Sequence, residues 1–485
     1  MDGSVLSVRR SVTIFFSAKY VELVLGLISS LILARLLTPE EFGIYSIAAS
    51  VVIIGYLFRN FGVGQYIVQV ETLNDGVMRS AFSITLGISW AIGLLLLIVA
   101  PFLGDYYENS GIATVLRFLS LNFFLLPFGS IADAVLRRNM AFDKLAVINV
   151  SAAFTTLIVG TTAAYWGASY LSIAWAANAS TLVSISLTLF FRPAGLPWLP
   201  GVSHLREVWK FGLKVGLMDL VNRGSDAATE LIIGRAQGLF SLGIYSRAYG
   251  TFWLFEYAFT QGIRPVILPY LSKAKHEQAD LGELYIGIVT FTSIFLIPFF
   301  VFLGMNAHDI IHVMYGDQWT EAVPILQVLC IAGLFFAPTI FFEQLMIAQG
   351  RPGQGLRYIA ISQALRVMAL VALVSISLEA AAVALIVWAL VKVALAFTMA
   401  RQHFGLRPLA FFKALWPAML TAIFLGLGIW GMHEATAPWQ TPLFRLLATG
   451  LCAALTWSAA IFAFDHPITV EVRNLYQKLR GGKPE

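Results

Sequence analysis

Long apolar runs separated by short polar breaks dominate the chain. A helix needs about 20 residues to cross the ~30 Å hydrocarbon core of a bilayer, and fourteen bounded runs reach that length. Breaks between them, such as LTPEE, LNDG and QGRPGQG, carry the Gly, Pro, Asn and Asp residues of turns. We therefore predict an all-α integral membrane protein with fourteen transmembrane helices. The expected spans are residues 11–36, 42–69, 80–103, 112–136, 146–166, 168–191, 208–234, 239–268, 283–304, 322–347, 355–377, 380–400, 409–431 and 442–464.

The composition agrees with this pattern. Of the 485 residues, 58% are hydrophobic and 12% are charged, whereas soluble proteins average about 45–50% apolar and about 25% charged residues. The net charge of +5 arises from basic residues scattered singly between apolar runs, which favours a membrane surface over nucleic acid as the partner. Cys330 and Cys452 each lie in an apolar run without metal-ligand spacing, so we expect both to serve packing.

Lys and Arg residues concentrate in alternate connections between the predicted spans. Arg137, Arg138 and Lys144 follow the fourth span, whereas the connection after the third span carries Asp105 and Glu108. Basic residues mark cytoplasmic loops by the positive-inside rule, and this alternation supports an even number of spans. We therefore expect both termini to lie in the cytoplasm.

An internal repeat relates the two halves of the chain. A shift of 200 residues aligns LILARLLTPEEFGIYSIA, residues 31–48, with LIIGRAQGLFSLGIYSRA, residues 231–248. The shared Arg-x7-Gly-Ile-Tyr-Ser frame predicts that helices one and two recur as helices seven and eight, with six spans per repeat. Six is even, so the repeats are parallel, about an axis along the membrane normal. We interpret the Gly-Ile-Tyr-Ser motif as tight packing at the start of a helix.

These repeats define the expected domain organisation. Two six-helix repeats are followed by two further helices and a cytoplasmic tail. The corresponding boundaries are 1–197 for helices one to six, 198–401 for helices seven to twelve, 402–464 for helices thirteen and fourteen, and 465–485 for the tail.

Charged side chains inside the predicted spans are candidates for functional sites, because each costs several kcal/mol unless it faces a cavity or a partner. The seventh helix carries Asp219, Arg223, Asp226 and Glu230, which fall within roughly 60° of one another on a helical period. The remaining charges are Lys19 and Glu22 on the first helix, Arg59 on the second, Arg247, Glu256 and Arg264 on the eighth, and the isolated Arg117, Asp133, Glu343, Arg366 and Lys392.

The segment ARLLTPEEFGIYSIAASVVIIGYLFRNFGVGQYIVQ, residues 34–69, resembles the opening of the polysaccharide transporter family. These are the Wzx-like lipid-linked oligosaccharide flippases of the multidrug/oligosaccharidyl-lipid/polysaccharide superfamily. The resemblance implies a V-shaped pair of six-helix lobes, an N-lobe and a C-lobe, around a central cavity, with two additional C-terminal helices. It also implies alternating access and location in the bacterial cytoplasmic (inner) membrane.

The same resemblance implies the substrate. This would be a polyprenyl-pyrophosphate-linked oligosaccharide repeat unit, carried from the cytoplasmic to the periplasmic leaflet for synthesis of O-antigen, capsule or exopolysaccharide. Membrane lipids and the polysaccharide polymerase machinery are the other implied partners.

The basic residues of the spans are candidates for binding the pyrophosphate, which carries about two negative charges that suit Arg and Lys. We expect Lys19, Arg59 and Arg223 to serve this role, with Arg247 and Arg264 as further candidates. Each arginine has an alternative role in a charge pair between the lobes or in snorkelling to the lipid headgroups.

The carboxylates of the spans leave two roles open. Glu22, Asp219, Asp226 and Glu256 either couple transport to H⁺ or Na⁺ or neutralise the cations. The chain shows no phosphate-binding loop, nucleophile with a base, metal-ligand cluster or dinucleotide motif. We therefore expect neither an enzyme nor a cofactor, and energy from an ion gradient, the membrane potential or consumption of the product.

Two other functions remain open. An ion-coupled multidrug or metabolite antiporter of the same superfamily would need an anionic pocket for cations, which several arginines disfavour. A membrane-embedded glycosyltransferase or polymerase usually carries its catalytic residues in a large outer loop. The longest outer connection expected here, about residues 305–321, is short.

Overall fold

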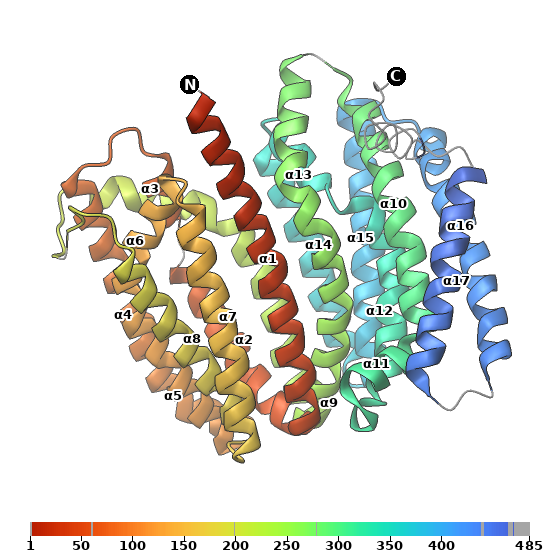
Figure 1. Cartoon of the computed structure of the whole chain (residues 1–485), viewed down its shortest axis with the longest axis horizontal. Helices are drawn as coiled ribbons and strands as arrows, with labels where there is room; N and C mark the ends of the chain where they lie inside the picture. Colours follow the sequence, from red (N-terminus) through yellow and green to blue (C-terminus); the bar gives the residue numbers. More distant parts are fainter. Residues whose placement is uncertain are drawn as a thin grey trace. The chain divides into compact units, whose positions relative to one another are not determined.

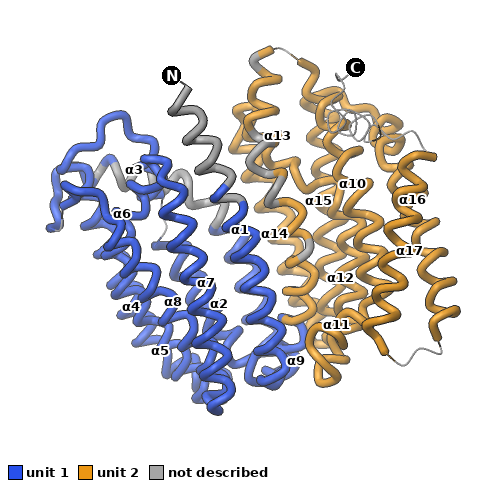
Figure 2. Tube along the Cα trace, in the orientation of Figure 1, with its two compact units in different colours: residues 1–246 blue, residues 247–485 orange. Residues whose placement is uncertain are grey.

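Helices account for every regular element that the structure describes, as the apolar pattern predicts (Figure 1). This computed structural model describes residues 2–59, 62–197, 199–277, 279–437, 441–463 and 469. Contacts within the chain divide it into two units, Met1–Ser246 and Arg247–Glu485, which Figure 2 shows in different colours. The expected all-α fold class is confirmed.

Unit 1 is a bundle of long helices joined by short turns. In this bundle α7 packs against α1 and α8, and α4 packs against α5. The expected fourth span, 112–136, is bent by 56° between α5 and α6, because Pro127 lacks an N–H group and its ring displaces the preceding carbonyl. The helices of this unit before α9 are α1 (Asp2–Leu36), α2 (Pro39–Arg59), α3 (Val63–Gln69), α4 (Asp75–Tyr106), α5 (Ser110–Leu125), α6 (Pro127–Arg138), α7 (Phe142–Tyr165) and α8 (Leu171–Phe190).

Unit 2 is a second helical bundle. Here α10 packs against α12 and α16, α15 packs against α12 and α14, and α16 packs against α17. A buried ion pair joins α11 to α17, since Arg445 Nη2 lies 2.6 Å from Asp309 Oδ1. After α9, the elements are α10 (Leu281–Met305), α11 (Ala307–Tyr315), η1 (Asp317–Trp319), α12 (Ala322–Phe336), η2 (Ala337–Thr339), α13 (Phe342–Ala348), α14 (Pro352–Leu373), α15 (Leu378–Phe404), α16 (Pro408–Thr436) and α17 (Pro442–Ala463).

The longest element, α9 (Leu205–His276), begins in unit 1 and continues in unit 2. It contains the residues of the expected seventh and eighth spans and is broken at Gly238, whose φ of 85° is a conformation that glycine adopts without strain. The break between α1 and α2 includes Thr38. The two breaks are therefore 200 residues apart, which equals the shift of the sequence repeat.

Two glycines bring the backbones of α2 and α9 into close contact. A Cβ atom on Gly43 would collide with the carbonyl oxygen of Leu239, and one on Gly243 would collide with the carbonyl oxygen of Pro39. The hydroxyl groups of the serines that end the two Gly-Ile-Tyr-Ser motifs lie 3.2 Å apart between these contacts. The interpretation of the motif as a packing motif is confirmed, and the contact is reciprocal.

Polar bonds also connect the first part of α9 to the rest of unit 1. Ser50 Oγ donates to Glu230 Oε2 at 2.5 Å, and Tyr107 Oη donates to the carbonyl of Leu231 at 2.9 Å. Burial raises the pKa of Tyr107 to about 12, so its hydroxyl keeps its proton and remains a donor at neutral pH. These bonds explain why this part of α9 belongs to unit 1.

Eleven helical segments in the described chain are long and apolar enough to cross a membrane, or twelve if the bent pair of α5 and α6 is one span. They correspond to the expected spans apart from the seventh and eighth, whose residues lie in α9. The chain is therefore a multi-pass membrane protein. The count of fourteen spans and their arrangement as parallel repeats stay predictions.

Candidate functional site

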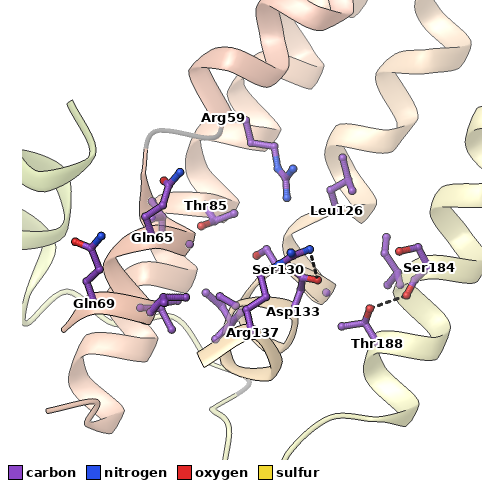
Figure 3. Close-up of a pocket in the computed structure, with 18 residues that line it drawn as sticks. Arg59, Gln65, Gln69, Thr85, Leu126, Ser130, Asp133, Arg137, Ser184 and Thr188 are labelled. Carbon is purple, nitrogen blue, oxygen red and sulfur yellow. Dashed lines mark hydrogen bonds and ion pairs between the residues drawn. The ribbon is translucent and has the colours of Figure 1, made fainter. Parts of the chain in front are cut away.

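A cavity of about 590 Å³ lies among the helices of unit 1 (Figure 3). This volume falls within the range of about 300–1,000 Å³ that is usual for small-molecule sites. Residues of α2, α3, α4, α6 and α8, with the turn before α6, form its walls, and we call it the unit 1 pocket. The polar residues on its walls are Arg59, Gln65, Gln69, Thr85, Ser130, Asp133, Arg137, Ser184 and Thr188.

The short helix α3 forms one wall of the unit 1 pocket. It begins after Gly62, whose φ of 59° lies in the left-handed region that favours glycine. Val63 and Ile67 lie one turn apart, and both are buried in a cluster with apolar residues of α4 and α6. This packing leaves Gln65 and Gln69 exposed on α3, where both line the pocket.

Arg138, at the end of α6, binds the C-terminal end of α3. Its Nη1 donates to the carbonyls of Ile67 at 2.7 Å and Val70 at 2.6 Å, with a longer bond to Val68 at 3.3 Å. Its Nη2 donates to the carbonyl of Glu71 at 3.2 Å. The last carbonyls of a helix have no partner within the helix, and a cation is favoured there. Arg138 therefore fixes α3 against α6.

Two arginines and one aspartate set the charge of the unit 1 pocket. Arg137 Nε donates to Asp133 Oδ2 at 2.8 Å, and Arg137 Nη2 donates to Asp133 Oδ1 at 3.2 Å, one turn apart on α6. Figure 3 shows the Arg59 guanidinium entering the pocket from the end of α2. The two cations and one carboxylate of the lining leave an excess of one positive charge.

Most other expected site residues of unit 1 lie outside this pocket. Lys19 Nζ lies 2.7 Å from Glu22 Oε2 on α1, so these two residues form an ion pair with each other. On α9, Arg223 is exposed and Asp226 is half-buried. The structure therefore brings Arg59, and none of these four residues, to the lining of the pocket.

Arg247 and Glu256 belong to unit 2. The Arg247 guanidinium lies over the rings of Tyr315 and Trp319, 5.2 and 5.3 Å from their centroids. Glu256 is buried, with 3% of its surface exposed. The side chains of two expected residues lie outside the described residues: Asp219 and Arg264.

Several pocket residues have no distinctive pattern in the sequence. Asp133, an isolated charge in the sequence, is bonded to Arg137, and their i,i+4 spacing on a helix is the signal from which this pair can be predicted. Ser130 and the glutamines of α3 give no such signal, because single polar residues are common near helix ends.

Lys392, a second isolated charge, lies in unit 2 over the Trp388 ring at 4.6 Å from its centroid.

Comparisons with known proteins give the family and the fold. Residues 32–324 match the model of a family described as polysaccharide biosynthesis protein. The chain is 22% identical to the lipopolysaccharide biosynthesis protein WzxC of Escherichia coli K12 over 333 residues, covering 67% of each chain. It is 24% identical over 311 residues to the succinoglycan biosynthesis transport protein ExoT of Rhizobium meliloti, covering 64% of this chain and 63% of that protein.

Solved structures share the fold at lower identity. The lipid II flippase MurJ, in an inward closed conformation, matches with a TM-score of 0.74 and 15% identity over 93% of this chain and 98% of MurJ. An inward-facing multidrug resistance MATE family transporter of the MOP superfamily matches with a TM-score of 0.59 and 13% identity. That alignment covers 79% of this chain and 94% of the transporter.

Proposed function

The chain belongs to the family of polysaccharide biosynthesis proteins, and from this premise we propose that it is a flippase for lipid-linked saccharides. Its substrate is a polyprenyl-pyrophosphate-linked oligosaccharide repeat unit, moved from the cytoplasmic to the periplasmic leaflet for synthesis of O-antigen, capsule or exopolysaccharide. The expected membership of a polysaccharide biosynthesis family is confirmed, and the fold is shared with MurJ. The names of ExoT and MurJ are those of a transport protein and a flippase, in agreement with the expectation that the chain is not an enzyme.

The unit 1 pocket is the observation that supports this proposal most directly. Polar and charged side chains cost free energy among membrane-spanning helices unless they serve a ligand, a cavity or each other. Here nine polar side chains from five helices surround one cavity, and Arg59 extends into it. A headgroup made of sugars and phosphates requires such an environment to cross the hydrocarbon core, while its lipid tail stays in the bilayer.

In the proposed mechanism the chain has fourteen spans, twelve of which form two six-helix lobes. The lobes rock about the headgroup and expose it first to the cytoplasm and then to the periplasm. The protein lies in the inner membrane with both termini in the cytoplasm, and a polysaccharide polymerase takes the product. Lys19, Arg59 and Arg223 are the first candidates to neutralise the anionic headgroup. Carboxylates such as Glu22 and Asp226 provide for coupling to H⁺ or Na⁺.

A reconstitution experiment tests this function. Purified full-length protein is placed in liposomes with lipid-linked saccharide. The saccharide is extracted from polysaccharide-producing cells that lack the gene for this protein. A membrane-impermeant periodate label then reports the fraction of saccharide that reaches the outer leaflet. We expect rapid protein-dependent labelling, reduced by Arg59→Ala and unchanged by Arg357→Ala, an exposed arginine of α14. Labelling no faster than in protein-free liposomes would refute the proposal.

The multidrug antiporter is the main alternative, because the MATE transporter shares the fold. The excess positive charge of the unit 1 pocket disfavours cationic drugs there. Deletion of the gene would decide between the functions. A flippase predicts loss of polysaccharide with unchanged drug sensitivity, whereas an antiporter predicts the reverse.

A further inference from the structure

Three of the four hydroxyl groups on the walls of the unit 1 pocket have already used their hydrogen-bond donors. Ser130 Oγ donates to the carbonyl of Pro127 at 2.8 Å, and Thr188 Oγ1 donates to the carbonyl of Ser184 at 2.7 Å. Thr85 makes the same kind of bond one turn back in α4, at 2.9 Å. A hydroxyl group has one donor and two acceptor lone pairs. These three side chains therefore offer the pocket only acceptors.

The carboxylate of Asp133 adds further acceptors to the lining of the pocket. An ionised carboxylate cannot donate, and its two oxygens have about four acceptor positions, of which Arg137 occupies two. The donors of the pocket come mainly from Arg59, which extends into it, and from the amides of Gln65 and Gln69 on α3. The lining thus combines acceptors on α4, α6 and α8 with donors on α2, α3 and, in Arg137, α6.

This arrangement discriminates between the two polar parts of a lipid-linked saccharide. An ionised pyrophosphate has acceptor oxygens only and about two negative charges, so it would meet the lone pairs of Ser130 and the charge of Asp133 without providing a donor. A sugar ring brings O–H groups that donate to these acceptors and oxygens that accept from these donors. The excess of a single positive charge also matches a neutral or singly anionic sugar better than a pyrophosphate.

We propose that the unit 1 pocket is the subsite for the sugar hydroxyls of the headgroup and that the pyrophosphate is bound outside it. This inference rests on the proposed function, because it assigns one part of that substrate to one site. In this assignment Arg59 binds sugar oxygens and no longer serves the pyrophosphate. The pyrophosphate is left to cations outside the pocket, of which Lys19 and Arg223 are the candidates.

A binding experiment with two probes tests the assignment. The full-length protein in nanodiscs is titrated with polyprenyl pyrophosphate without sugar, and with lipid-linked saccharide extracted from producing cells that lack the gene. Ser130→Ala removes one acceptor, so we expect about a five- to tenfold loss of affinity for the saccharide probe and none for the sugar-free probe. Ser120→Ala is the matched control, because Ser120 makes the same bond within α5, at 2.6 Å to the Arg117 carbonyl, outside the pocket.

Asp133→Asn gives opposite results for the two assignments. It replaces one acceptor oxygen with an NH₂ donor and removes a negative charge. A sugar subsite predicts weaker binding of the saccharide probe, whereas a pyrophosphate site predicts tighter binding of the sugar-free probe. Tighter binding of that probe, or unchanged saccharide affinity in both Ser130→Ala and Asp133→Asn, would overturn the assignment and leave the flippase function standing. Failure of the unmodified protein to bind the saccharide probe would instead reject the proposed function itself.

Discussion

Replacement of Arg138 by alanine should release the end of α3 while leaving the bundle of unit 1 folded. The two shortest bonds of Arg138, to the carbonyls of Ile67 and Val70, are 2.7 and 2.6 Å long. Hydrogen bonds to charged groups contribute about 1.5–3 kcal/mol each, and the lower end applies here because both bonds are partly exposed. Their loss should lower the free energy of opening α3 by about 3 kcal/mol.

Hydrogen exchange measures this local opening. The amide of Val70 donates to the carbonyl of Tyr66 at 2.9 Å, so its exchange requires α3 to open. A loss of about 3 kcal/mol should raise its exchange rate by about 100-fold. Arg138→Lys should have an intermediate effect, because an ammonium group keeps the charge but lacks the planar fork of donors.

Arg137→Ala is the control for this prediction, because Arg137 binds Asp133 and not α3. We expect no change in the exchange of α3 in that variant. Translocation by Arg138→Ala should fall, because Gln65 and Gln69 no longer stay at the pocket wall. Unchanged exchange of the Val70 amide in Arg138→Ala would refute the role of Arg138 as the residue that fixes α3.

Three further substitutions test the packing of the two units by thermal unfolding of the purified protein. Gly43→Ala should destabilise by about 1–3 kcal/mol, because the added methyl group meets a backbone carbonyl, whereas Gly26→Ala, with open space around it, should not. Arg445→Ala should cost about 3 kcal/mol, because Asp309 stays buried without its arginine, and the double variant lacking both side chains should recover part of this loss. Arg247→Lys should cost about 1 kcal/mol through weaker stacking on two aromatic rings, and an unchanged melting temperature would contradict that role.

The fold was largely predictable because crossing a bilayer imposes a length and a polarity on each helix. Two of the expected spans contain a local break that leaves hydropathy unchanged. The expected span 112–136 bends at Pro127, and within the span 42–69 the helix α3 begins anew after Gly62. Neither break adds charged residues or lengthens the run, so the hydropathy pattern is the same for a continuous helix and for a broken one.

The candidate site was less predictable. Arg59 could be predicted as a site residue from the sequence, because an arginine within a membrane span costs free energy unless it serves a function. The roles of Ser130 and Arg138 depend on carbonyl groups in neighbouring turns and helices, and only three-dimensional structure brings these groups within reach. Ser and Thr are common in membrane helices because they bond to their own backbone, so their presence alone does not mark a site.

The reciprocal contact of α2 and α9 has a geometric consequence for any motion of these helices. Gly243 lies against the carbonyl of Pro39 at the start of α2, and Gly43 lies against the carbonyl of Leu239, just after the break in α9. On the same face of α2, one turn from Gly43, lie Pro39 and Ile47, so a slide of α2 by one turn would place a large side chain where only a hydrogen atom fits. Translation along the helix axes is therefore blocked at this point, while small changes of crossing angle leave both close approaches intact.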